Sequence, residues 1–112
     1  MQSPAREHDP IQIGPMRIDG QKREVRVDDY PITLTNTEFE LLTYLAMHVG
    51  KACPREEIFT SVWGYSSEFS SNSLDVVVYR LRNKLKPYGL ENMVETVRGF
   101  GFKLADPDVE LA

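Results

Sequence analysis

The stretch Ser71–Lys86, SNSLDVVVYRLRNKLK, carries the strongest structural signal in the chain. Apolar residues recur along it at the spacing of one helix face. They are Leu74, Val77, Val78, Leu81 and Leu85, and Pro87 ends the pattern. The opposite face carries Asn72, Val76, Tyr79, Arg80 and Asn83. We therefore expect a helix that buries one side and presents hydrogen-bond donors on the other.

Short strands are expected at both ends of the chain. After the helix, Val94–Val97 and Phe102–Leu104 flank the glycine-bearing turn Arg98-Gly99-Phe100-Gly101, which predicts a hairpin. Four β-type segments lie near the N-terminus, separated by turn residues. They are Ile11–Ile13, Met16–Ile18, Glu24–Val27 and Ile32–Leu34. Their short, regular spacing favours a small antiparallel sheet.

Two further helices are predicted between this sheet and Ser71. Thr35 and Glu38 form a capping box for the first, which runs until Gly50. The second has Pro54 in its first turn and ends at Gly64. The predicted fold class is therefore α+β: a winged helix-turn-helix with an N-terminal four-stranded antiparallel sheet, three helices and a C-terminal β-hairpin wing. We expect residues 1–10 to be a flexible linker, 11–105 the domain, and 106–112 an acidic tail.

Composition limits the classes of function. The 112 residues suffice for one domain, and no apolar run approaches the roughly 20 residues of a membrane-spanning helix, so we expect a cytoplasmic protein. A single cysteine, Cys53, supplies neither an internal disulfide nor a cysteine zinc cluster. No motif predicts a cofactor, a metal site or catalysis, and Cys53 is interpreted as structural.

The charge distribution favours a nucleic-acid partner although the net charge is −4. Residues 76–105 hold six basic and two acidic residues, which gives +4, whereas the rest of the chain carries −8. A helix fits the DNA major groove, where Arg80 suits guanine, Asn83 suits adenine and Val76 suits a thymine methyl group. Arg98 in the hairpin suits a narrow minor groove.

Four strings, in order, resemble the effector domain of the OmpR/PhoB family of bacterial response regulators. They are Leu34–Leu42 (LTNTEFELL), Val62–Gly64 (VWG), Leu74–Val76 with Arg80–Leu85 (LDV, RLRNKL), and Glu95–Phe102 (ETVRGFGF). The resemblance covers about Ile11 to Leu104. It implies binding to promoter direct repeats as a head-to-tail dimer, and control by a receiver domain and its cognate sensor kinase. The linker-like residues 1–10 lead us to expect that a receiver was cut away ahead of them, and a naturally short regulator is the alternative.

The resemblance also implies roles for individual residues. Base contacts are expected from Val76, Arg80, Asn83 and Arg98. The resemblance implies backbone contacts from Arg55, Trp63, Arg82 and Thr96. Our further candidates for backbone contacts are Asn72, Ser73 and Tyr79. The loop of Tyr65, Ser66, Ser67, Glu68, Phe69 and Ser70 is similar to the segment that touches RNA polymerase in activators of the family.

Three positions depart from the family pattern. Asn72 stands where many members have a phosphate-binding Arg, Val77 replaces a frequent His, and Phe102 replaces the usual Tyr. We therefore expect fewer backbone contacts and weak binding by one domain alone. The predicted function is sequence-specific binding of double-stranded DNA without enzymatic activity. The alternative is a winged-helix protein-interaction module that has lost DNA binding.

Overall fold

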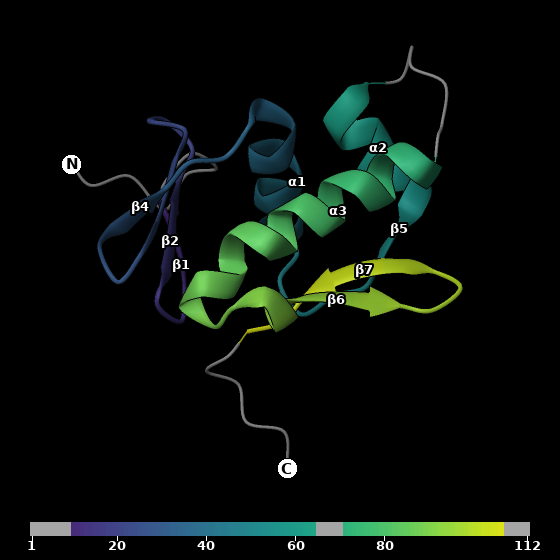
Figure 1. The fold of residues 1–112 in the computed structure, drawn as a ribbon. Coiled ribbons are helices and arrows are strands. Elements are labelled where there is room, and N and C mark those ends of the chain that lie inside the picture. Colours follow the sequence, from purple (N-terminus) through teal and green to yellow (C-terminus); the bar gives the residue numbers. More distant parts are fainter. Residues whose placement is uncertain (1–9, 65–70, 107–112) are drawn as a thin grey trace, which may run out of the picture.

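A computed structural model describes residues 10–64 and 71–106. The elements follow the predicted order of sheet, helices and hairpin (Figure 1). The four-stranded antiparallel sheet consists of β1 (Ile11–Ile13), β2 (Met16–Asp19), β3 (Glu24–Val27) and β4 (Tyr30–Ile32), in that spatial order. The helices are α1 (Asn36–Met47), α2 (Arg55–Trp63) and α3 (Ser71–Leu85).

The C-terminal part of the fold is the wing. The 3-10 helices η1 (Lys86–Tyr88) and η2 (Glu91–Met93) lead from α3 to the hairpin of β6 (Val94–Val97) and β7 (Gly101–Leu104). A two-residue strand, β5 (Cys53–Pro54), pairs with the other side of β7, so the wing is a three-stranded sheet ordered β5-β7-β6. The predicted fold class is thus the observed one. The expected linker, the loop at 65–70 and the tail fall almost wholly outside the described residues.

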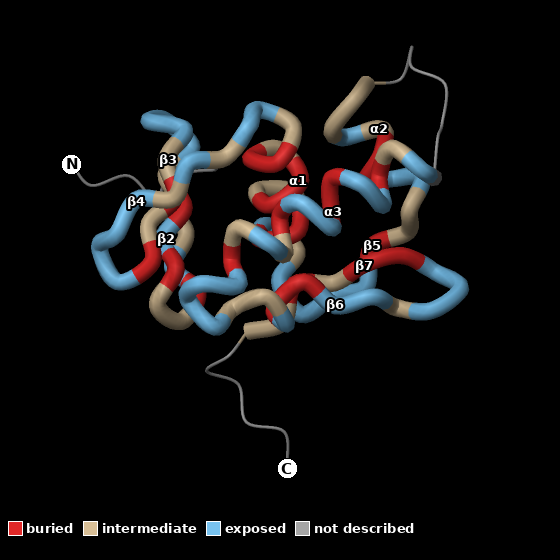
Figure 2. Tube along the Cα trace, viewed as in Figure 1, coloured by how far each residue is buried: buried red, intermediate tan, exposed pale blue. Residues whose placement is uncertain are grey.

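One apolar core joins the N-terminal sheet, the helices and the wing. Alternating residues of β2 and β3 face it, and they are Met16, Ile18, Val25 and Val27. All five apolar residues predicted for the inner side of α3 are buried. The tube in Figure 2 shows buried and exposed segments alternating along α3, with its outer side and the wing turn in solvent.

The fourth strand was predicted two residues too late, at Ile32–Leu34 instead of Tyr30–Ile32. The turn between β3 and β4 contains only Asp28 and Asp29, with φ of 50° and 71°. Positive φ at both central residues is typical of the type I′ turn, which joins two antiparallel strands directly. Tyr30 therefore already pairs with Val27. Pro31 is accommodated because β4 is an edge strand.

The boundaries of the two shorter helices also differ from the prediction. The capping box of Thr35 and Glu38 is present, but α1 ends at Met47, before the expected stop at Gly50. Pro54 was expected in the first turn of α2 and instead has an extended ψ of 144° as the N-cap residue. It belongs to β5 because it pairs with Gly101 of β7.

Candidate nucleic-acid interface

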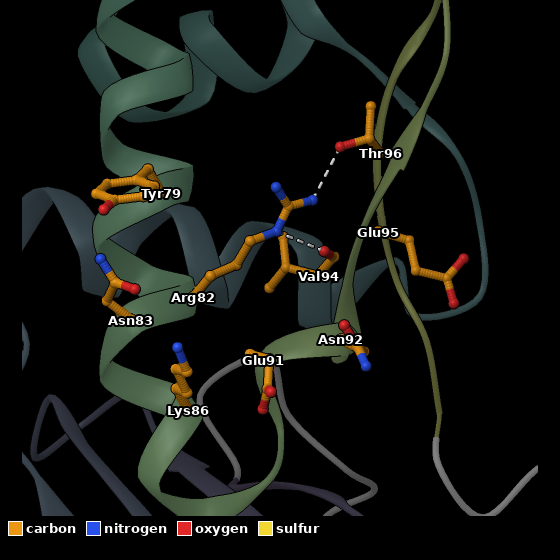
Figure 3. Close-up of a pocket in the computed structure, with 9 residues that line it drawn as sticks. All are labelled: Tyr79, Arg82, Asn83, Lys86, Glu91, Asn92, Val94, Glu95 and Thr96. Atoms are coloured by element: carbon orange, nitrogen blue, oxygen red, sulfur yellow. Dashed lines mark hydrogen bonds between the residues drawn. The ribbon is translucent and has the colours of Figure 1, made fainter.

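The outer side of α3 forms a ridge with a groove on each flank. Val76 is 45% exposed on this ridge, and Arg80 and Asn83 are exposed with it. The groove toward the wing, called the wing-side groove, has a volume of about 690 Å³ (Figure 3). It is lined by Tyr79, Arg82, Asn83, Lys86, Glu91, Asn92, Val94, Glu95 and Thr96. The groove toward α1, of about 520 Å³, is lined by Thr35, Thr37, Glu38, Trp63, Asn72, Ser73, Val76, Val77 and Arg80.

The six basic residues of the C-terminal region are not equally available to a ligand. Lys84 pairs with Glu38 at 2.6 Å, and the Lys103 ammonium lies 3.6 Å from the Glu95 carboxylate. Arg80, Lys86 and Arg98 are exposed, and their side chains have no hydrogen-bond or ion-pair partner within the described residues. These last three are therefore the cations best placed for phosphates or base edges. All of them lie on α3, at its C-terminal end or in the wing turn.

Glu38 explains why Lys84 is unavailable. Its side chain is only 2% exposed, yet it accepts hydrogen bonds from the Lys84 ammonium and from the Thr35 backbone N–H at 3.0 Å. Burial alone would raise the pKa of the Glu38 carboxyl. The hydrogen bonds and the charge of Lys84 outweigh burial and leave the pKa below its ordinary value of 4.5. The Glu38–Lys84 pair therefore links the start of α1 to α3.

Arg82 is half-buried between α3 and β6. Its Nε donates to the carbonyl oxygen of Val94 at 2.9 Å, and its Nη2 donates to Oγ1 of Thr96 at 2.9 Å (Figure 3). The guanidinium carbon also lies 5.9 Å from the ring centre of Phe102. Two of the predicted backbone-contacting residues, Arg82 and Thr96, are thus brought together and bonded to each other.

Arg55 connects the start of α2 to α3 through an ion pair with Asp75. Its guanidinium lies 5.1 Å from the ring centre of Phe102, on which Arg82 also converges. Phe102 is buried and has no hydroxyl group, so this position contributes packing and cation–π contacts. Arg55 is half-buried. To make the expected phosphate contact, its guanidinium group must bind the phosphate while it remains paired with Asp75.

The remaining predicted contact residues surround the N-terminal half of α3. Trp63 is half-buried and stacks on Phe59 with a centroid separation of 4.5 Å. It shares the α1-side groove with Asn72 and Ser73. Tyr79 lies on the wing side and is 67% exposed. The expected polymerase-contact loop, Tyr65–Ser70, lies outside the described residues.

Gly101, which was expected in the hairpin turn, is the first residue of β7. A Cβ atom at Gly101 would lie 1.9 Å from the Cys53 carbonyl oxygen, so glycine is required for the approach of β7 to β5. Gly99, by contrast, supplies a φ of 75° in the wing turn, as expected of a glycine turn. Cys53 is buried in the core, and burial together with nearby Glu57 raises the pKa of its thiol. Both glycines stood out in the sequence as residues of a tight turn, but the close approach of Gly101 to Cys53 was not predicted.

No helix in residues 10–64 and 71–106 combines the length and apolar content needed to cross a bilayer. The same residues hold no cluster of three or more His, Cys, Asp and Glu side chains suited to a metal ion.

Arg and Asn side chains lie on an exposed helical ridge between two grooves, and a hairpin with an exposed Arg lies beside it. This arrangement defines the winged helix-turn-helix class of DNA-binding effector domains. Residues 29–104 match the family described as "Transcriptional regulatory protein, C terminal". The chain belongs to this family, whose members are non-enzymatic transcription-factor domains, and its resemblance to the OmpR/PhoB type is confirmed.

Individual relatives agree with this assignment. The response regulator ArlR of Staphylococcus saprophyticus is 45% identical over 92 residues, which cover 82% of this chain and 42% of ArlR. The chain thus spans about two-fifths of the length of the curated relatives it matches. The RstA DNA-binding domain of Klebsiella pneumoniae, solved in complex with the RstA box, has a TM-score of 0.76 at 30% identity. That alignment covers 88% of this chain and 99% of the RstA domain.

Proposed function

We propose that residues 11–105 form a domain that binds double-stranded promoter DNA in a sequence-specific manner and thereby regulates transcription. The observation that carries the proposal is the exposed ridge of α3, where Val76, Arg80 and Asn83 lie on one side of a helix that has no acidic residue after Asp75. These side chains match the thymine methyl group and the guanine and adenine edges of the major groove. The similar RstA domain, which was solved in complex with the RstA box, supports DNA binding.

The wing supplies a second contact in this proposal. Arg98 is exposed in the turn between β6 and β7, and an arginine is the side chain that a narrow minor groove attracts. The residues proposed to set the register on phosphates are Arg55, Trp63, Asn72, Ser73, Tyr79 and Thr96. Phosphate contacts position the domain, whereas the ridge discriminates the sequence.

The proposal extends to the full-length protein. We propose that a receiver domain controlled by a sensor kinase regulates the domain in the cytoplasm, and that two copies bind direct repeats head to tail. The match to only two-fifths of ArlR supports a further domain. The loop Tyr65–Ser70 is proposed to contact RNA polymerase.

Selection of bound sequences from random duplexes tests the function. We expect two similar half-sites about 10 base pairs apart, one helical turn, from a dimer on direct repeats. A single enriched half-site would support DNA binding and contradict the dimer. No enrichment, together with no salt-dependent retention, would contradict DNA binding and favour a protein-interaction module.

Arg80→Ala tests the role of the ridge on the selected site. We expect a loss of about 1 to 3 kcal/mol on that site and little loss on scrambled DNA, because a base contact is removed. Arg17→Ala is the matched control: it removes the same charge from the exposed face of β2, in the N-terminal sheet. Equal losses on both duplexes would refute base recognition by Arg80.

A further inference from the structure

We infer that Arg82 is a positioning residue, which orients the hydroxyl group of Thr96 toward a DNA phosphate and fixes β6 against α3. The inference deepens the proposed function and rests on it. It replaces the direct phosphate contact that the family resemblance implies for Arg82 with an indirect one. The phosphate contact itself is made by Thr96.

The bonds of Arg82 support this assignment. Two of its three guanidinium nitrogens donate to β6, one to a main-chain carbonyl and one to a side-chain oxygen, both at 2.9 Å. The side chain is half-buried, whereas Thr96 is exposed at the rim of the wing-side groove. Figure 3 shows the guanidinium group extending from α3 across the groove to these two acceptors. Thr96 is therefore more open to a ligand than the group behind it.

The chemistry of a hydroxyl group gives this bond a direction. A threonine hydroxyl has one proton to donate and two lone pairs that accept. Because Oγ1 of Thr96 accepts from the cation Arg82, its own proton remains for another acceptor. A charged donor also polarises the O–H bond and makes it a stronger donor. A phosphate oxygen at the groove rim is the acceptor that the proposed complex supplies.

The same two bonds fix the geometry of the wing. Val94 is the first residue of β6, and Arg98 follows its last residue, Val97. Arg82 lies on α3, two residues after Arg80. Its two hydrogen bonds therefore connect α3, proposed to read the major groove, to β6, the strand that leads to Arg98. The planar fork of a guanidinium group spans two acceptors, whereas a lysine ammonium is a single point charge on a flexible stem.

Arg82→Lys distinguishes a direct phosphate contact from the positioning of Thr96 and β6, because lysine keeps the positive charge and lacks the planar guanidinium group that spans two acceptors. On the selected duplex we expect Arg82→Lys and Thr96→Val each to weaken binding about 10- to 150-fold, the effect of one charge-assisted hydrogen bond. The double variant should bind no more weakly than either single variant. Lys86→Gln is the control in the same groove, and its loss should add to that of Thr96→Val.

Two results would overturn the inference. One is Arg82→Lys binding within twofold of the wild type, because lysine can replace arginine in a direct phosphate contact. The other is an Arg82→Lys loss that adds to that of Thr96→Val, because two separate phosphate contacts would contribute independently. Thr96→Ser and Thr96→Val keep the test independent of the folding of Arg82 variants: serine should bind like the wild type, and equal binding by both would also refute the role. A wild-type domain that retains no duplex overturns the proposed function, and this inference with it.

Discussion

Gly101→Ala tests the packing that anchors the wing. The added Cβ atom would lie 1.9 Å from the carbonyl oxygen of Cys53 and 3.0 Å from the backbone nitrogen of Arg55. Side-chain Cβ atoms essentially never approach other atoms closer than 3.0 Å, so β5 and β7 must separate by roughly 1 Å. The obstacle is the backbone of Cys53 and Arg55, so it cannot be relieved by a rotamer change.

The expected cost follows from this separation. Overpacking of this kind costs about 1 to 3 kcal/mol, and a lost backbone hydrogen bond adds about 1 kcal/mol. The bond at risk runs from the Arg55 N–H to the Phe100 carbonyl oxygen, at 3.1 Å. We expect the free energy of unfolding to fall by about 3 kcal/mol. For a domain of this size, the melting temperature should fall by roughly 12 to 24 °C.

Thermal unfolding followed by circular dichroism measures the effect. Gly20→Ala is the control, because no atom lies within 4 Å of its added Cβ and its φ is not positive. The control should change the free energy of unfolding by less than about 0.5 kcal/mol. A Gly101→Ala domain that melts within about 4 °C of the Gly20→Ala domain would show that β5 and β7 separate at little cost, and would refute the reasoning.

Three further predictions concern stability and reactivity. Because the folded-state pKa of Glu38 is lowered, its contribution to stability is present above about pH 4.5 and is lost as the pH falls through the folded pKa. Glu38→Gln should therefore cost about 1 to 2 kcal/mol in urea unfolding at pH 7 and clearly less at pH 3; equal costs at both values would contradict the ion pair. Burial and a raised pKa should make Cys53 react with a thiol reagent far more slowly in the folded protein than in urea, and similar rates would contradict its placement in the core. Asp29→Gly should stabilise the domain by about 0.5 kcal/mol, because glycine adopts a φ of 71° without strain, and a lower melting temperature would argue against the turn geometry.

Local signals made most of the fold predictable. The inner face of α3 follows from a 3.6-residue period over fifteen residues, and the capping box of Thr35 and Glu38 is a contact between near neighbours. The strand β5 has no such signal, because two residues contain no period. It exists only because Gly101 lets β7 approach Cys53. Pairing between distant segments therefore set the start of α2, and local propensity did not.

The candidate site was predictable as a surface but not as a set of available charges. The helix period places Val76, Arg80 and Asn83 on one side of α3, and their exposure is confirmed. Counting basic residues could not show that Lys84 is paired with Glu38, since 46 positions separate them. The same holds for Arg82, whose partners lie 12 and 14 residues away. Both pairings depend on how α3 packs against other elements.

The β5 strand has a mechanical consequence. Because β7 is flanked by β5 and β6, and Arg55 at the start of α2 bonds to the turn residue Phe100, the wing has no free hinge where it joins the helices. The helix α3 and the wing are thus held in place before binding, so in the proposed complex little ordering entropy is lost. In the proposed complex any mismatch in groove width must then be absorbed by the duplex. The bendability of base steps that no side chain touches thereby becomes part of what the protein selects.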